Sequence, residues 1–340
     1  MGPFSIEYGL FYGEQSKISI RKDMSVGLPT QITFNTNNAR FDKTLYDKVN
    51  LYWACGSDIY MLNTEIHEIE NKYSLKMNGA GQVFHDIADF HFNTTELQIF
   101  KNKWMLEKSA KIEFMKDKTK ITNFYLSDNE HYLEVNGDIS GSKLDTVRID
   151  FSNITPTILV PFFPKGVLDS VDFRGNGDVK ICAVLKNPKL LGDLSLNKLK
   201  YNGFLYGDMD VALKETEKIG HLQMNSLFRS GPLKGLAING GLQLTQADNL
   251  EMDLYGELPR KTSLKILDPF LKGILDFRDG TIRGNFHVFG TTDEPKAEGL
   301  LSVEQARVKV NYLATEYTFA GNIKITEKGL FSVRSIKVFD

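Results

Sequence analysis

The densest group of side chains that could bind a metal ion is His85, Asp86, Asp89 and His91. Imidazole and carboxylate groups are zinc ligands, but zinc sites favour tighter, paired spacings on a rigid turn or helix, and no cysteine lies near this group. We therefore expect these residues to form the polar end of a strand. We expect no metal and no cofactor anywhere in the chain.

Motifs for covalent or phosphoryl-transfer chemistry are missing from the sequence. It has no Gly-x-Ser-x-Gly elbow, no Walker loop and no His-Glu-x-x-His pair. The six histidines are scattered, and none is spaced with serine and aspartate as a hydrolase would require. These absences predict a protein that is not an enzyme.

Composition narrows the class of protein further. The chain has 340 residues, a formal net charge of -2 and 41% hydrophobic residues, which is enough to build a core and argues against disorder. It has no dense run of Lys and Arg, so we expect no nucleic-acid partner. Cys55 and Cys182 permit one disulfide bridge but do not imply it, and two small apolar side chains are the favoured interpretation.

Apolar residues recur at every second position in short runs, which is the period of a β-strand with one apolar face. Early examples are Ile18 with Ile20 and Ile32 with Phe34, and the same pattern continues to the end of the chain. Turn-forming triplets stand between the runs, and we interpret them as hairpin turns: Asn136-Gly137-Asp138, Gly175-Asn176-Gly177 and Asn239-Gly240-Gly241. This spacing predicts an antiparallel all-β chain of roughly 25 to 30 strands.

Only residues 154–168 and 262–275 break the alternation. Prolines lie inside both segments, so we expect short helices or irregular crossings there. Each segment also begins one copy of an internal repeat. Pro-Phe, Arg-Gly-Asn and Pro-Lys recur in the same order roughly 107 residues apart, which indicates an elongated array of stacked units. The matched positions are Pro161 and Pro269, Arg174 and Arg283, and Pro188 and Pro295.

The C-terminal stretch PKAEGLLSVEQARVKVNYLATEYTFAGNIKITEKGLFSVRSIKVFD resembles the TamB family of AsmA-like proteins, especially its Bacteroidetes members. The resemblance rests on a proline, a glycine-led strand, a tyrosine-phenylalanine strand and a closing pair of alternating strands. It extends upstream through Trp104-Met105-Leu106 and KIEFMKDKTKITNFYLSDNEHYLEVNGDIS, and it thins before residue 95. The residues that carry the C-terminal match are Pro295, Gly299, Tyr317, Phe319, Gly321, Gly329 and Ile336.

The resemblance implies an elongated, strongly curved antiparallel β-sheet that forms a U-shaped groove with an apolar concave face and a few short helices. It implies phospholipid acyl chains as the ligand, moved without chemistry between the inner and outer membranes across the periplasm of a diderm bacterium. The alternative is an assembly factor for outer-membrane proteins, working with a barrel partner of the TamA or BamA type. A passive scaffold whose apolar faces are fully covered by protein is a third possibility.

We expect the chain to be a section of a longer protein anchored in the inner membrane, with one continuous domain in three sections, 1–95, 96–200 and 201–340. We also expect two sets of lipid-contacting residues. Candidates for constrictions of the groove are the Pro-Phe segments, which could equally cap a core at each repeat junction: Phe162, Phe163, Phe270 and Leu271. Candidates for the groove wall come from the alternating strands: Ile149, Val179, Ile181, Leu194, Leu196, Met209, Val211, Leu242, Leu244, Met252, Leu254, Val308, Val310, Ile323 and Ile325.

Overall fold

A computed structural model describes most of the chain, and its contacts divide it into two compact units. Unit 1 is Met1–Phe151 with Ile181–Pro188, and unit 2 is Ser152–Lys180 with Lys189–Asp340. Each unit is treated by itself below. The residues described are 4–8, 11–22, 25, 30–41, 44–70, 72–159, 168–186, 188–218, 220–244, 250–327 and 331–339.

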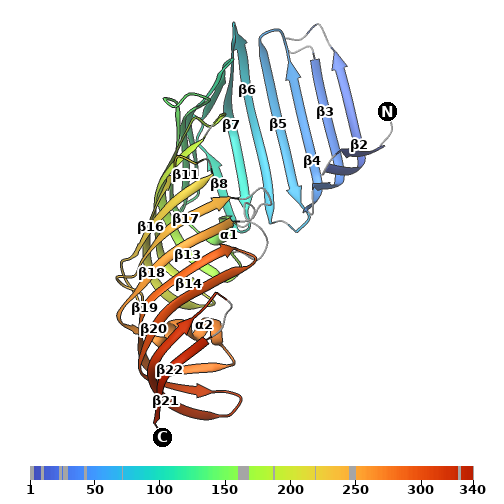
Figure 1. Cartoon of the computed structure of the whole chain (residues 1–340). Helices are drawn as coiled ribbons and strands as arrows, with labels where there is room; N and C mark the ends of the chain where they lie inside the picture. Colours follow the sequence, from blue (N-terminus) through green and yellow to red (C-terminus); the bar gives the residue numbers. More distant parts are fainter. Residues whose placement is uncertain are drawn as a thin grey trace. The chain divides into compact units, whose positions relative to one another are not determined.

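Unit 1 is an antiparallel meander, and from β1 to β7 each strand pairs with the next along the chain (Figure 1). β7 is long enough to pair with both β8 and β9, two short strands that lie end to end between β7 and β10. The strands are β1 Phe4–Tyr8, β2 Phe11–Lys22, β3 Thr30–Phe41, β4 Thr44–Cys55, β5 Ile59–Glu68, β6 Tyr73–Phe84, β7 Ile87–Ile99, β8 Asn102–Leu106, β9 Lys111–Phe114, β10 Lys118–Ser127, β11 Tyr132–Ser140 and β12 Thr146–Ile154.

Unit 2 repeats the same plan with longer strands. From β14 to β22 every strand pairs antiparallel with its sequence neighbour. The elements after β12 are α1 Pro156–Leu159, β13 Val171–Cys182, β14 Lys189–Tyr201, β15 Phe204–Glu215, β16 His221–Phe228, β17 Ala237–Leu244, β18 Leu250–Ser263, the 3-10 helix η2 Leu264–Leu267, α2 Asp268–Leu271, β19 Leu275–Thr291, β20 Pro295–Val310, β21 Thr315–Ile325 and β22 Phe331–Phe339.

The predicted fold class is therefore confirmed as an antiparallel all-β chain with a few short helices. The helices α1, η2 and α2 fall in the two segments where the alternation breaks. The described residues form the strands β1 to β22, which is fewer than the spacing of apolar runs predicted. Several strands run for 12 residues or more, longer than the spacing of apolar runs suggested.

The three triplets interpreted as hairpin turns lie inside strands, so that prediction was wrong. Asn136-Gly137-Asp138 belongs to β11, Gly175-Asn176-Gly177 to β13 and Asn239-Gly240-Gly241 to β17. At Gly137, Gly177 and Gly240 glycine is required by the close approach of the next strand. A Cβ on Gly137, which has φ +126°, would lie 2.0 Å from the carbonyl oxygen of Thr146.

Two asparagines of these triplets, and an aspartate of β15, hydrogen-bond to residues of the preceding strand that have positive φ. Asn123 has positive φ at a register shift in β10, and its backbone N–H donates to Asn136 Oδ1 at 2.6 Å. The N–H of Asn153 in β12 donates in the same way to Asn176 Oδ1 at 2.9 Å, and the N–H of Lys198 in β14 donates to an aspartate of β15 at 2.8 Å. Each side chain satisfies the backbone N–H of a residue with positive φ.

The internal repeat corresponds to a repeated order of elements. α1 precedes β13, which carries Arg174-Gly175-Asn176, and β14 follows directly after Pro188. In the second copy η2 and α2 precede β19, which carries Arg283-Gly284-Asn285, and β20 begins at Pro295. The sequence repeat therefore marks equivalent points in a continuing meander.

The main hydrophobic core of unit 2 lies between one face of its sheet and a capping segment, residues 262–274, which contains η2 and α2. Leu264 and Ile266 of this segment are buried among side chains of β15, β16 and β18–β20. Tyr206 Oη donates to the carbonyl oxygen of Ile266 at 2.8 Å, and burial raises the pKa of this phenol to about 12. Burying each of the two aliphatic side chains contributes about 1.5–3 kcal/mol, so the segment is a structural part of the unit.

Candidate functional site

The cross-strand register places the predicted groove residues of β14 to β21 on one face of unit 2. Paired residues of an antiparallel ladder share a face. Leu196 lies opposite Met209 and Leu194 opposite Val211, and this row continues through the next strands. Its members are Leu242 opposite Met252, Gly240 opposite Leu254, Gly284 opposite Leu301, Leu301 opposite Ile323 and Gly299 opposite Ile325.

Val308 joins this face beyond a bulge in β20, because it packs in the same core as Ile282 and Val303, and Val310 lies two residues further on. Val179 in β13 also approaches it, since its Cγ2 lies 3.2 Å from where a Cβ of Gly192 would be. Ile149 in β12 and Ile181 in β13 are half-buried and are not part of the register just traced.

The groove candidates differ in how far they are covered by protein. Val211 and Val308 are buried, with exposed fractions of 7% and 5%. The other groove candidates in unit 2 are half-buried, except Leu244, whose side chain lies outside the described residues. The capping segment therefore covers the part of the apolar face around Val308, and much of the rest of this face is partly open.

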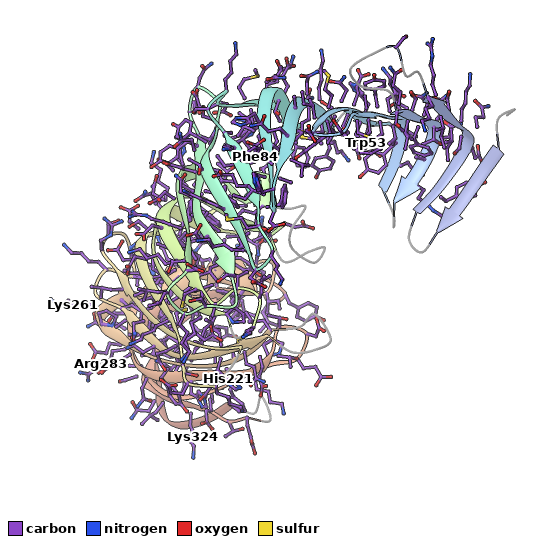
Figure 2. The ribbon with its side chains drawn as sticks, turned by 90° about the horizontal axis from the view of Figure 1, so that it is seen from above. Trp53, Phe84, His221, Lys261, Arg283 and Lys324 are labelled. Carbon is purple, nitrogen blue, oxygen red and sulfur yellow. The ribbon has the colours of Figure 1, made fainter. Side chains whose placement is uncertain are left out.

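Unit 1 has a second apolar face, which the set of candidate residues did not include. Its rows run from Ile20 through Ile32, Trp53 and Leu62 to Gly79, and a second row contains Leu51. The described part of unit 1 contains no helix, and Figure 2 shows β2 to β6 as a single layer with side chains on both sides. Ile20 is 70% exposed, and the side chains sharing this face are half-buried: Ile32, Phe34, Leu51, Trp53, Leu62, Ile66, Leu75 and Met77.

The opposite face of the same strands is mainly polar, although Tyr52 and Met61 also lie on it. Asn63, Asn78 and Asn93 form a ladder across β5, β6 and β7, in which each amide donates to the next side-chain oxygen. The alternation of Leu51 with Trp53, and of Leu62 with Ile66, was visible in the sequence. It could have identified this surface.

The candidate constriction residues lie in two different situations. Phe162 and Phe163 are outside the described residues. Phe270 stacks on Tyr201, with ring centroids 5.1 Å apart, yet remains 62% exposed, while Leu271 packs against the edge of the core. The buried apolar side chains of the capping segment are Leu264 and Ile266, which precede Phe270 in the chain.

The polar face of unit 2 carries an open depression of about 1440 Å³. His287 lies there, with Nε2 2.5 Å from Asp253 Oδ1 and Nδ1 3.0 Å from Glu298 Oε1. Burial alone would lower the pKa of His287, but the hydrogen bonds and charges of the two carboxylates raise it. In Figure 2 the labelled Arg283 and Lys324, which also line this depression, lie along the outer side of the unit.

The group around His85 lies at the turn between β6 and β7. Asp89 is buried and accepts a hydrogen bond from the Gln82 N–H at 3.0 Å, and its carboxylate lies 3.5 Å from Lys111 Nζ. Burial would raise the pKa of Asp89, but these partners lower it overall. The described residues contain no group of three or more His, Cys, Asp or Glu placed to hold a metal ion.

Comparisons of the chain with protein-family models, curated proteins and solved structures gave no match. Among the described residues no helix has the length and apolar character needed to cross a membrane. Cys55 and Cys182 are both free thiols.

Proposed function

We propose that this protein binds the acyl chains of phospholipids along the apolar face of its sheet and conducts them without chemical reaction. The observation that carries the proposal is the face of β2 to β6 in unit 1, where apolar side chains stand in register on a single-layer sheet. Most sheets bury such a face against a second layer. A contiguous apolar surface that stays partly open is typical of a binding surface.

The energetics of acyl chains fit such a surface. Each methylene exposed to water costs about 0.8 kcal/mol, so a chain of about sixteen carbons faces roughly 12 kcal/mol on leaving a bilayer. A sheet face with apolar side chains at regular spacing removes much of this cost at every position along its length. Specific chemistry is not needed, and the charged headgroup stays in water at the edge of the surface.

In unit 2 the acyl chains bind to the parts of the apolar face that the capping segment does not cover. Leu194, Leu242, Met252, Leu254 and Ile325 are half-buried there and lie in continuous rows. We propose that the two faces belong to a U-shaped groove that carries lipid between inner and outer membranes. This follows the resemblance of the sequence to the TamB family.

Native mass spectrometry and lipid extraction test the proposal with two adjacent substitutions. Leu62→Asp places a charge on the apolar face, and Asn63→Asp places the same charge on the opposite face with almost no change in shape. We expect phospholipid to co-purify with the wild type and with Asn63→Asp, and to be lost from Leu62→Asp. Circular dichroism verifies that each variant folds.

Lipid-free protein in all samples, with no uptake from vesicles, would overturn the proposal. That result would favour assembly of outer-membrane proteins or a passive scaffold. Equal loss of lipid from both variants would also contradict a one-sided surface.

A further inference from the structure

One end of the unit 2 strands forms a continuous rim. In an antiparallel meander alternate connections meet at the same end, and here they are residues 202–203, 229–236, 264–274 and 311–314. The connection 264–274 contacts the other three. Asn202 Nδ2 donates to Pro269 O at 3.4 Å, Asn311 N donates to Ile274 O at 3.1 Å, and Leu233 and Leu236 share the core with Leu264. These four connections are called the basic rim below.

Large apolar side chains are exposed along the basic rim. Tyr312 is 95% exposed, Phe270 and Ile274 are each 62% exposed, and Leu313 is 54% exposed. They are neighbours in space, because the hydrogen bond between Asn311 and Ile274 brings the turn 311–314 beside the end of the capping segment. Exposed apolar groups gathered at one edge, with two aromatic rings among them, are typical of a surface that enters a membrane interface.

Basic side chains accompany them. Lys234, Lys265 and Lys272 are exposed, and within the described part of the chain none has an ion-pair partner. Arg229 is paired with Asp210 at 2.8 Å, and the one acidic residue of these connections, Asp268, accepts from the Phe277 N–H at 3.2 Å. The free charge of the rim is therefore positive.

Among the described residues, the connections at the opposite end of β15 to β22 have neither feature. Its described connections, 216–218 with 220, 292–294 and 326–327, contain Glu217, Lys218, Asp293, Glu294 and Glu327. The residues described there include no exposed large apolar side chain. The difference between the two ends gives unit 2 a defined polarity.

We propose that the basic rim is a docking surface for an anionic lipid bilayer. Tyr312, Phe270 and Ile274 enter the interfacial region, while the three lysines contact lipid phosphates. The two components act together, because a few exposed apolar residues or a few lysines alone hold a protein only weakly at a membrane. This inference goes beyond acyl-chain binding on the sheet face and does not depend on it.

Vesicle co-sedimentation tests the inference with the full chain. The vesicles contain phosphatidylcholine alone or phosphatidylcholine with phosphatidylglycerol. The double variant Lys265→Glu with Lys272→Glu reverses charge on the rim. The matched control, Lys218→Glu with Lys324→Glu, makes the same change in net charge at exposed positions elsewhere on unit 2.

We expect sedimentation with the anionic vesicles and little with neutral ones. Each lysine near an anionic surface contributes about fivefold to binding, so the rim variant should bind at least about 25-fold more weakly. Tyr312→Ser should also weaken binding, and its effect should persist at high salt, where the lysine contribution is screened. All substituted side chains are exposed, so unchanged melting temperatures are expected.

The inference is overturned if the rim variant binds as well as the wild type, or if the control loses as much affinity as the rim variant. Failure of the wild type to sediment with either vesicle also overturns it and leaves a protein partner as the occupant of the rim. Acyl-chain binding is tested separately, by co-purification of lipid with Leu62→Asp. A negative result in the vesicle experiment therefore does not contradict acyl-chain binding, and the reverse also holds.

Discussion

Replacing Leu264 by Ala tests whether the capping segment holds unit 2 together. Leu264 is 2% exposed and fills the core between the segment and β19, where a Cβ on Gly280 would lie 2.9 Å from its Cδ1. Truncating a leucine so enclosed costs about 3–4 kcal/mol, from lost burial and the cavity that remains. For a unit of this size we expect the melting temperature to fall by roughly 6–12 °C.

Phe270→Ala is the matched control on the same segment. Its ring is 62% exposed and stacks only on Tyr201, so its removal should cost less than about 1.5 kcal/mol. Thermal and urea unfolding followed by circular dichroism compare the two variants. A loss for Phe270→Ala as large as for Leu264→Ala would refute the assignment of the core. Lower lipid occupancy in Phe270→Ala with unchanged stability would support the constriction predicted for this residue.

Two further predictions concern backbone fit and pH. Gly240→Ala should lower the free energy of unfolding by at least about 1–3 kcal/mol, because φ is +155° and a Cβ would lie 1.9 Å from a carbonyl oxygen of β18. Gly241→Ala is the control, and it should be nearly neutral because a Cβ there would have nothing within 4 Å. Urea unfolding compares the two variants. Equal effects at the two positions would contradict the register of β17. His287 should titrate by NMR above its ordinary pKa of about 6.5. Its contribution to stability is then full below that value and is lost as the pH rises through the folded pKa. The variants Asp253→Asn and Glu298→Gln should each lower this pKa, and an unchanged titration in both would refute the pairing.

The fold class could be predicted because alternation of apolar residues reports strand faces directly. Pairs such as Leu194 with Leu196 and Val308 with Val310 lie on the face that alternation assigned to them. The positions of turns could not be predicted in this way. Asn136-Gly137 has the composition of a hairpin turn, yet its glycine meets Thr146 of the next strand and its asparagine satisfies a bulge in the previous one.

The candidate surface was predicted only in part. Which alternating residues are covered depends on where a distant segment folds back. Nothing in the alternation of Val308 with Val310 indicates that Val308 lies in the core under the capping segment. The open face of unit 1 was omitted because the resemblance thins before residue 95. The basic rim could not be predicted from the sequence, because its residues come from four separate connections that only the strand order brings to one end of the sheet.

Site-specific photo-crosslinking along β5 tests the central claim most directly. A photoreactive residue is placed in turn at each position from Met61 to Ile66, and crosslinked phospholipid is measured in living cells that express the protein. Binding of acyl chains to the apolar face predicts lipid adducts at positions 62, 64 and 66, and none at 61, 63 and 65, because successive side chains point to opposite faces. Lipid adducts without this alternation, or protein adducts alone at positions 62, 64 and 66, would contradict it.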